Sequence, residues 1–182
     1  MPKTKKSARL IISKGGRGVG WLSSNPWRTV VMLGFVVLVS FEGVHQYKII
    51  EAATIEQQAK DVCGSYGEKA SPSTAQCIAD KVLIDNFYAG WNHRTPDEKT
   101  CLSKLWTRES NWEWNATNSS SGAYGIPQAL PASKLASVYN NPAYGTWQDN
   151  VVSQERWGLG YISDRYGRPC GAWNHELVYG WY

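Results

Sequence analysis

An uncharged apolar stretch near the N-terminus, Thr29–Phe41, divides this chain into two parts of opposite character. Residues 1–28 carry seven Lys or Arg side chains and no acidic one, whereas all 15 acidic residues and all four cysteines lie after Phe41. A basic segment before an apolar run keeps the N-terminus in the cytoplasm and sends the rest of the chain across the membrane. We therefore expect a basic cytoplasmic tail over residues 1–28 and a folded domain outside the membrane.

The apolar stretch is consistent with a transmembrane anchor or with a signal peptide. Its 13 residues would form a helix of about 20 Å, which is shorter than the roughly 30 Å hydrocarbon core and suits a signal peptide. No small-x-small cleavage pattern follows, however, because Ile50 precedes Ala52 and Glu51 precedes Ala53 where a small residue is required. We expect a single-pass signal-anchor over residues 29–44, with secretion after signal cleavage as the alternative.

The rest of the chain has the periodicity of helices and no convincing strand pattern. Ile49, Ile50 and Ile55 recur at loosely helical spacing, which predicts a helical stalk over residues 45–62. The remaining residues, 63–182, number about 120, enough to bury one core. Further helices are expected at residues 75–88, 96–112, 131–139 and 149–166. The predicted fold class is mainly α, with a single domain after the N-terminal membrane segment.

One carboxylate, Glu109, lies on the apolar face of the helix predicted over residues 96–112. The apolar side chains of this helix recur at three- and four-residue spacing, at Cys101, Leu102, Leu105 and Trp106. The same spacing places Glu109 on their face of the helix. Burial disfavours the charged form of an acid, so the pKa of Glu109 should rise toward the value of a proton donor near neutral pH. The alternative is a structural role, in which Glu109 caps the helix or pairs with Arg108 or Arg156.

A second catalytic carboxylate is not evident. Glu113, one turn later, lies beyond the apolar stripe and is expected at a solvated edge. The chain then has no acidic residue before Asp149. Glycosidases with two carboxylates place them roughly 5 to 10 Å apart across the bond. The pattern therefore favours a mechanism with one carboxylate, although Asp149, Glu155 and Asp164 stay open as distant partners.

Tryptophan is abundant in this part of the chain, and eight of the ten Trp residues lie between Trp91 and Trp181. Flat aromatic rings can cover the apolar faces of sugars. Trp106 and Trp157 lie on apolar helix faces and are expected in the core, whereas Trp112, Trp114, Trp147 and Trp181 stay open between core and surface.

Four blocks in the second half of the chain, matched in order, resemble a known enzyme family. They are similar to segments of lytic transglycosylases. The first two are Leu105–Ala116 and Ser121–Pro131, and the other two are the Arg-Tyr-Gly and Pro-Cys-Gly-Ala-Trp patterns of the Trp157–Trp173 region. The group is the soluble-lytic, goose-type-lysozyme-like one, and the closest likeness is to its small actinobacterial-type secreted or anchored branch. The resemblance covers about Cys101–Tyr182 and implies that residues 63–182 form a lysozyme-like domain.

The resemblance also implies roles for single residues. Glu109 takes the position of the general acid and then base. Ser110 completes the family's Glu-Ser pair and is expected to bind substrate. Tyr124 and Gln128 match a loop that lines the substrate cleft. Trp173 and Asn174 lie where the wider family has Ala-Tyr-Asn, and the indole of Trp173 cannot accept a hydrogen bond as that tyrosine can; both are expected to contact substrate.

The implied reaction is non-hydrolytic cleavage of the bond between N-acetylmuramic acid and N-acetylglucosamine in peptidoglycan, which leaves 1,6-anhydro-muramic ends. A hydrolytic muramidase of the same fold, or an inactive peptidoglycan-binding scaffold, are the alternatives. The expected location is a bacterial cell membrane with the catalytic domain outside.

The four cysteines predict two disulfides, because an even number in a translocated domain of modest size is typical of a disulfide framework. Three pairings are possible from the residues alone. The family resemblance implies Cys101 with Cys170, which leaves Cys63 with Cys77. A metal site is not expected, because the chain has no Cys-x-x-Cys motif and its three histidines lack ligand spacing.

No cofactor is expected either. The chain after Phe41 has 15 acidic and 12 basic residues, so the net charge of +4 reflects the N-terminal tail. This distribution suits contact with a membrane and argues against nucleic acid as a partner. The sequence does not indicate a protein partner.

Overall fold

The computed structural model describes residues 51, 53–91, 97–138 and 142–182. These residues belong to one compact unit, which spans Phe41–Tyr182. The predicted cytoplasmic tail, the predicted signal-anchor and residues 45–50 and 52 of the predicted stalk lie outside the described residues. Within the described residues, no helix is both long enough and apolar enough to cross a membrane.

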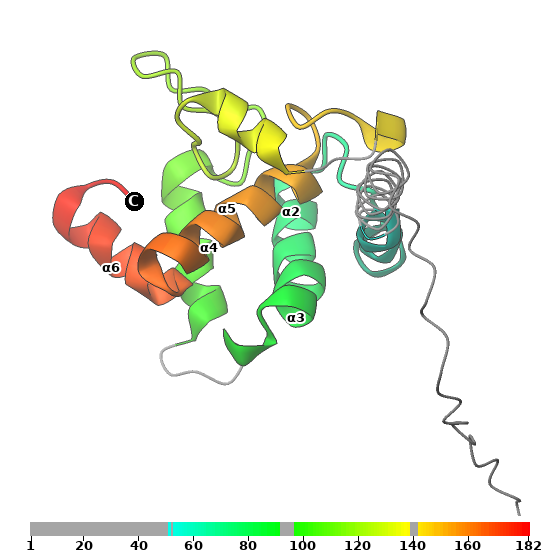
Figure 1. The fold of residues 1–182 in the computed structure, drawn as a ribbon, viewed down its shortest axis with the longest axis horizontal. Helices are drawn as coiled ribbons and strands as arrows, with labels where there is room; N and C mark the ends of the chain where they lie inside the picture. The colour runs from blue at the N-terminus through cyan, green and yellow to red at the C-terminus, as the bar shows by residue number, and fades with distance from the viewer. Residues whose placement is uncertain (1–50, 52, 92–96, 139–141) are drawn as a thin grey trace, which may run out of the picture. The chain divides into compact units, whose positions relative to one another are not determined.

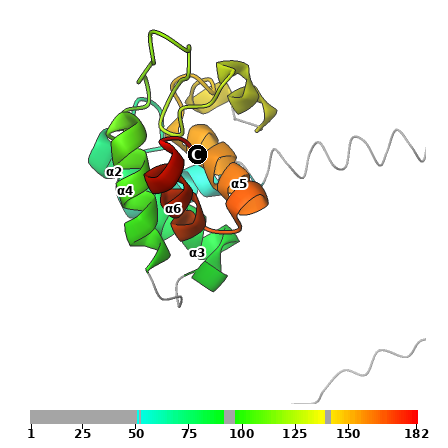
Figure 2. The same cartoon turned by 90° about the vertical axis from the view of Figure 1, so that its left-hand side faces the viewer.

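The described part of the chain is mainly helical and contains no strand, which confirms the predicted mainly α fold class. In chain order, its elements are a helical segment over residues 53–63, α2 (Pro72–Ile78), the π-helical turn η1 (Ala79–Leu83), α3 (Ile84–Phe87), the short 3-10 helix η2 (Ala89–Trp91), α4 (Glu98–Ser110), the 3-10 helices η3 (Ala132–Ser137) and η4 (Pro142–Tyr144), α5 (Val151–Tyr166) and α6 (Pro169–Tyr179). α5 crosses the domain (Figure 1), and α6 lies between α4 and α5 (Figure 2).

Helix α4 forms where the periodicity predicts it. Asp97 caps its N-terminus by accepting a hydrogen bond from the Lys99 backbone N–H at 3.2 Å, which satisfies one of the donors that a helix start leaves unpaired. The helix ends at Ser110, and its C-cap residue, Asn111, adopts the left-handed conformation with φ 51°. Its buried stripe ends in Trp106 and Ser110, so Glu109 lies at the margin of the buried face.

Helix α6 is not predicted by the sequence. It begins at Pro169 and ends before Gly180, which has a left-handed backbone, φ 75°. These are favourable ends for a helix. Its buried residues are Pro169, Cys170, Ala172 and Glu176, with no large aliphatic side chain among them. The usual apolar period is therefore absent, and other contacts hold α6 in place.

Two of these contacts join the start of α6 to the start of α4. The first is the disulfide Cys101–Cys170. The second involves the fully buried Glu98, which accepts a hydrogen bond from the Cys170 backbone N–H at 2.8 Å and lies 3.4 Å from the Arg168 guanidinium. The structure also contains the disulfide Cys63–Cys77. The expectation of two disulfides is thus confirmed, with the pairing that the family resemblance implied.

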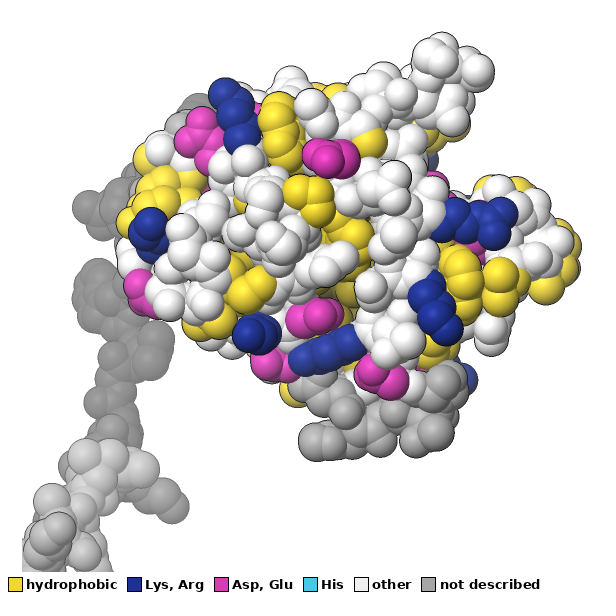
Figure 3. Space-filling view, turned by 180° about the vertical axis from the view of Figure 1, so that it is seen from behind, with side chains coloured by type: hydrophobic (Ala, Val, Ile, Leu, Met, Phe, Trp, Pro, Cys, Tyr) yellow, Lys and Arg dark blue, Asp and Glu magenta, His cyan; other side chains and the backbone are white. Residues whose placement is uncertain are grey.

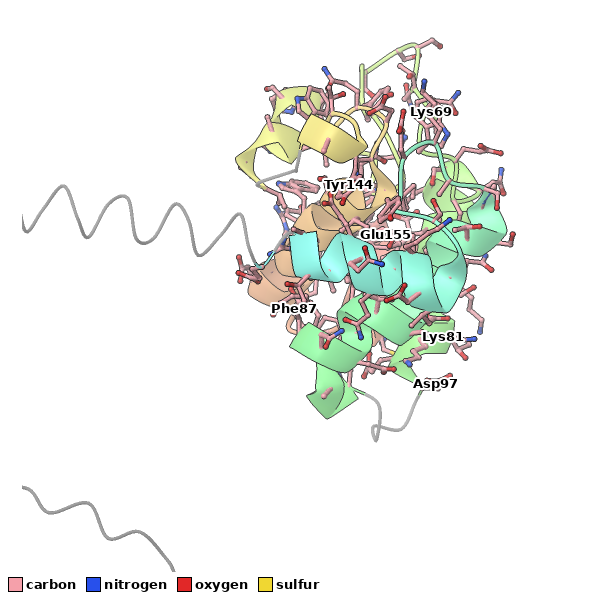
Figure 4. All side chains as sticks on the ribbon, turned by 90° about the vertical axis from the view of Figure 1, so that its right-hand side faces the viewer. Lys69, Lys81, Phe87, Asp97, Tyr144 and Glu155 are labelled. Atoms are coloured by element: carbon pink, nitrogen blue, oxygen red, sulfur yellow. A yellow bond between two sulfur atoms is a disulfide. The ribbon has the colours of Figure 1, made fainter. Side chains whose placement is uncertain are left out.

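The helical segment over residues 53–63, which the sequence analysis assigned to a stalk, packs into the domain. Ile55 and Ala59 are buried in the core. The Asn150 side-chain amide, at the start of α5, donates a hydrogen bond to Glu56 at 3.4 Å. Figure 4 shows the labelled Glu155 of α5 behind this segment. The described part of the predicted stalk therefore belongs to the folded domain.

Candidate active site

Glu109 lies in the last turn of α4 with its side chain half-buried. Its carboxyl group makes no ion pair or hydrogen bond with any residue that the structure describes. Burial, and then the negative charge of Glu176, raise the pKa of Glu109 to about 7, while Arg108 acts in the opposite direction. An acid with this pKa can exchange a proton in both directions near neutral pH.

Both basic residues considered as structural partners of Glu109 are engaged elsewhere. Arg108 Nε lies 2.8 Å from Glu176 Oε1 on α6. Arg156 lies 3.2 Å from Glu51, which precedes the helical segment over residues 53–63. The alternative in which Glu109 forms a structural ion pair with Arg108 or Arg156 is therefore wrong.

The chain turns sharply directly after Glu109. Asn111 and Trp112 both have positive φ, 51° and 65°, a conformation that side chains with a Cβ rarely adopt. Trp112 is held there because its ring is buried and contacts Trp106 edge-on with 5.1 Å between the ring centroids. Local strain of this kind persists only where surrounding contacts stabilise it, and it is concentrated at functional sites.

Ser110, the residue paired with Glu109 in the resemblance, is buried beneath the following loop. Its hydroxyl lies 2.9 Å from the carbonyl oxygen of Ile126 and 3.2 Å from that of Trp106, and it accepts a hydrogen bond from the Trp112 backbone N–H at 3.1 Å. These contacts attach the loop to the end of α4. A direct contact between Ser110 and substrate stays a prediction.

Tyr124 and Gln128 lie in the same loop. The Tyr124 hydroxyl donates a hydrogen bond to the carbonyl oxygen of Gln148 at 2.9 Å. Gln128 has φ 47°, and its side-chain amide donates to the carbonyl oxygens of Gly125 at 2.9 Å and Ala116 at 3.2 Å. Both side chains are half-buried, so they stabilise the loop and retain some exposed surface.

Gln154 of α5, which the sequence analysis missed, holds this loop onto the helical core. Its side chain is fully buried. Its Oε1 accepts a hydrogen bond from the Ile126 backbone N–H at 3.0 Å, and its Nε2 lies 3.0 Å from the carbonyl oxygen of Trp114. Gly125 passes so close that a Cβ there would lie 2.5 Å from Gln154 Oε1. A buried glutamine with several loop partners is a signal visible only in the folded chain.

The C-terminal residue also reaches the site. The Trp106 indole Nε1–H donates to the Tyr182 hydroxyl at 2.9 Å, and that hydroxyl donates to the Pro127 carbonyl oxygen at 3.0 Å. Burial, and then the charge of Glu109, hold the pKa of Tyr182 well above its ordinary value. A neutral phenol therefore lies close enough to Glu109 to respond to its charge.

The two α6 residues expected to contact substrate differ in burial. Trp173 is half-buried and packs against the core, whereas Asn174 is exposed. Glu176 follows on the same helix and is buried. The structure makes it the acidic residue whose charge acts on Glu109.

Several tryptophans differ in environment. Trp106 is fully buried, as predicted, and so is Trp112. The assignment of Trp157 to the core is wrong, because it is half-buried and stacks on Tyr161 with 5.3 Å between the ring centroids. Trp181 is exposed, and the guanidinium of Arg165 lies 5.0 Å from its ring centroid.

On the face of the domain seen in Figure 3, acidic and basic side chains are interspersed rather than gathered by sign. Among the described residues, no three or more His, Cys, Asp and Glu side chains are grouped in a way that could hold a metal ion.

In comparisons with family models, curated proteins and solved structures, nothing matches this chain.

Proposed function

We propose that this protein is a lytic transglycosylase with a lysozyme-like domain, and that it cleaves the N-acetylmuramic acid to N-acetylglucosamine bond of peptidoglycan. The observation that carries the proposal is Glu109: a half-buried carboxyl at the end of α4, with a pKa of about 7 and no ion-pair or hydrogen-bond partner among the described residues. These are the properties of a general acid that must later act as a base.

In the proposed reaction, protonated Glu109 donates its proton to the glycosidic oxygen, and the bond from that oxygen to the anomeric carbon breaks. The acetamido group of the N-acetylmuramic acid stabilises the positive charge that develops at its anomeric carbon. Glu109, now a carboxylate, removes the proton from the 6-hydroxyl of this N-acetylmuramic acid, and the 6-oxygen bonds to the anomeric carbon. The product is a 1,6-anhydro ring, and Glu109 is protonated again.

A mechanism with one catalytic carboxylate is supported by the state of Glu176. Glu176 is the acidic residue whose charge acts on Glu109, yet its side chain is 3% exposed and one of its oxygens is paired with Arg108. Its other oxygen, Oε2, is buried as well. A carboxylate that cannot reach solvent is poorly suited to hold the attacking water of a two-carboxylate glycosidase.

The proposed substrate lies outside the cell, and the two disulfides support this location. Cys63–Cys77 and Cys101–Cys170 are both formed, as is usual in oxidising compartments. We infer that the domain acts on peptidoglycan glycan strands next to a bacterial membrane, to which the N-terminal segment over residues 29–44 anchors it.

The decisive experiment is mass spectrometry of purified peptidoglycan after incubation with the full chain, the Glu109→Gln variant and the Glu113→Gln control. Glu113 is exposed and lies four residues after Glu109, beyond the end of α4. We expect anhydro-muropeptides from the wild-type protein and from the control, and none from Glu109→Gln. Products heavier by one water would indicate a hydrolytic muramidase, and retained binding without cleavage would indicate a scaffold.

A further inference from the structure

Glu176 is the buried acid of α6, and the reaction proposed above does not use it. Its side chain is 3% exposed, and Oε1 lies 2.8 Å from Arg108 Nε on α4. Its second oxygen, Oε2, is buried without a hydrogen-bond partner among the described residues. Leaving a carboxylate oxygen in this state costs free energy of folding.

The two members of this ion pair differ in exposure, and the difference matters for Glu109. The Arg108 side chain is 50% exposed, whereas that of Glu176 is almost fully buried. Water screens a charge at the surface more strongly than one in the interior. The pair is therefore not neutral as seen from Glu109, and the negative charge of Glu176 has the larger effect of the two.

Few other charged or titratable groups face Glu109. From its own helix, Arg108 acts on it, and from α6, Glu176. From the C-terminal segment, the Tyr182 hydroxyl lies close by, and Tyr161 and Tyr166 of α5 pack around Tyr182. The pKa of Tyr182 is held well above its ordinary value, so this phenol is neutral over the working range of Glu109.

We propose that Glu176 is a positioning residue of this site, whose buried carboxylate, held through one oxygen by Arg108, keeps the proton on Glu109 until the leaving oxygen takes it. The inference rests on the proposed role of Glu109 as the acid. Arg108 stabilises the buried negative charge of Glu176 by pairing with one of its oxygens. It does not cancel the effect of that charge on Glu109, because the Arg108 side chain is half-exposed and water screens its charge more strongly. Glu176 itself does not contact substrate.

The competing explanation is that the ion pair serves only to join α6 to α4. Breaking a buried ion pair by removing one partner destabilises a protein, so loss of stability in a Glu176 variant would fit both explanations. The titration of Glu109 separates them, because a purely structural tie would leave the proton affinity of Glu109 unchanged in a folded variant.

The experiment follows the Glu109 carboxyl by carbon NMR in the full-length chain, with glutamate labelled at the side-chain carboxyl carbon. Loss of one signal in Glu109→Gln identifies the resonance. The wild-type chain should titrate with a midpoint of about 7. In Glu176→Gln we expect a midpoint lower by on the order of one pH unit, and the alkaline limb of kcat/KM should move down by the same amount. Glu113→Gln, which removes an exposed carboxylate, should change neither quantity.

A second variant, Arg108→Gln combined with Glu176→Gln, removes both charges and leaves no unpaired ion that could prevent folding. Its Glu109 midpoint should lie between those of Glu176→Gln and the wild type, because the buried charge outweighs the half-exposed one. Near-ultraviolet circular dichroism verifies the fold. An unchanged midpoint in either folded variant overturns the inference, even if the wild type cleaves glycan. A shifted midpoint without any cleavage by the wild type would retain the effect of Glu176 on the protonation of Glu109 and overturn the proposed reaction.

Discussion

The Trp106 indole donates a hydrogen bond to the hydroxyl of Tyr182 over 2.9 Å, and this contact brings the end of the chain onto the helix that carries Glu109. The same hydroxyl donates to the Pro127 carbonyl oxygen at 3.0 Å. A phenol can accept and donate at once. Tyr182 therefore links α4, the loop that follows it and the C-terminus beside the candidate acid.

Replacing Tyr182 with Phe should weaken this link while keeping the ring. The Trp106 N–H and the Pro127 carbonyl would both lose a partner, so we expect the free energy of unfolding to fall by about 1 to 3 kcal/mol. Cleavage should fall too, because the loop next to Glu109 loses a support. Urea unfolding measures the first effect. Tyr179→Phe is the matched control, since the Tyr179 side chain is 63% exposed; equal stability of the two variants would contradict the role given to Tyr182.

The pH dependence of cleavage should follow the protonation of Glu109. The acid must carry its proton when the glycosidic bond breaks, and its pKa is about 7. Above that pH the protonated fraction falls, so kcat/KM should decrease about tenfold for each further pH unit. Rates measured from pH 5 to 9 on soluble glycan strands test this. A profile that stays flat through pH 7 and above would exclude Glu109 as the proton donor.

Glu155→Gln should stabilise the protein at neutral pH. Both oxygens of Glu155 are buried without a hydrogen-bond partner among the described residues, and burial, then the charge of Asp80, raise the pKa of Glu155 well above its ordinary value of 4.5. The folded state therefore binds a proton that the unfolded state releases, so this residue costs stability progressively as the pH rises above 4.5.

The glutamine variant removes that pH-dependent cost. We expect little change in the free energy of unfolding near pH 4 and a gain that grows as the pH rises toward 7, because the unfolded state then releases the proton that the folded state keeps. Thermal or urea unfolding over this pH range gives the comparison. The exposed carboxylate of Glu68 serves as a control through Glu68→Gln. A gain that does not grow with pH would argue against a protonated Glu155.

Gly158→Ala should destabilise the protein, although alanine usually favours a helix by about 0.5 to 1 kcal/mol over glycine. A Cβ at position 158 would lie 2.7 Å from Trp106 Cζ2 and 2.9 Å from Pro127 Cβ. Both neighbours are rigid, so α5 would have to move away from α4, and overpacking of this kind typically costs about 1 to 3 kcal/mol. Gly160→Ala is the control in the same helix, because nothing lies within 4 Å of a Cβ there. The two variants should shift the melting temperature in opposite directions.

Much of the fold follows from patterns that are local in the sequence. The three- and four-residue spacing of α4 predicts its extent within two residues at each end and places Glu109 at the margin of the buried face. The apolar face of α5 predicts that helix equally well. The even number of cysteines predicts two disulfides, both of which are formed.

Tertiary structure decided what acts on Glu109. No sequence pattern marks the residues around Glu109. Glu176 lies on a helix that lacks an apolar period, and Tyr182 lies beyond the last helix. Gln154 is a polar residue of α5 whose burial is evident only in the folded chain. Local periodicity depends on residues one turn apart, so the sequence by itself determined α4, α5 and the position of Glu109 on α4. The partner of Arg108 and the neighbours of Glu109 depend on how α4, α6 and the C-terminus pack together, and only the folded chain brings these charges into one low-dielectric environment.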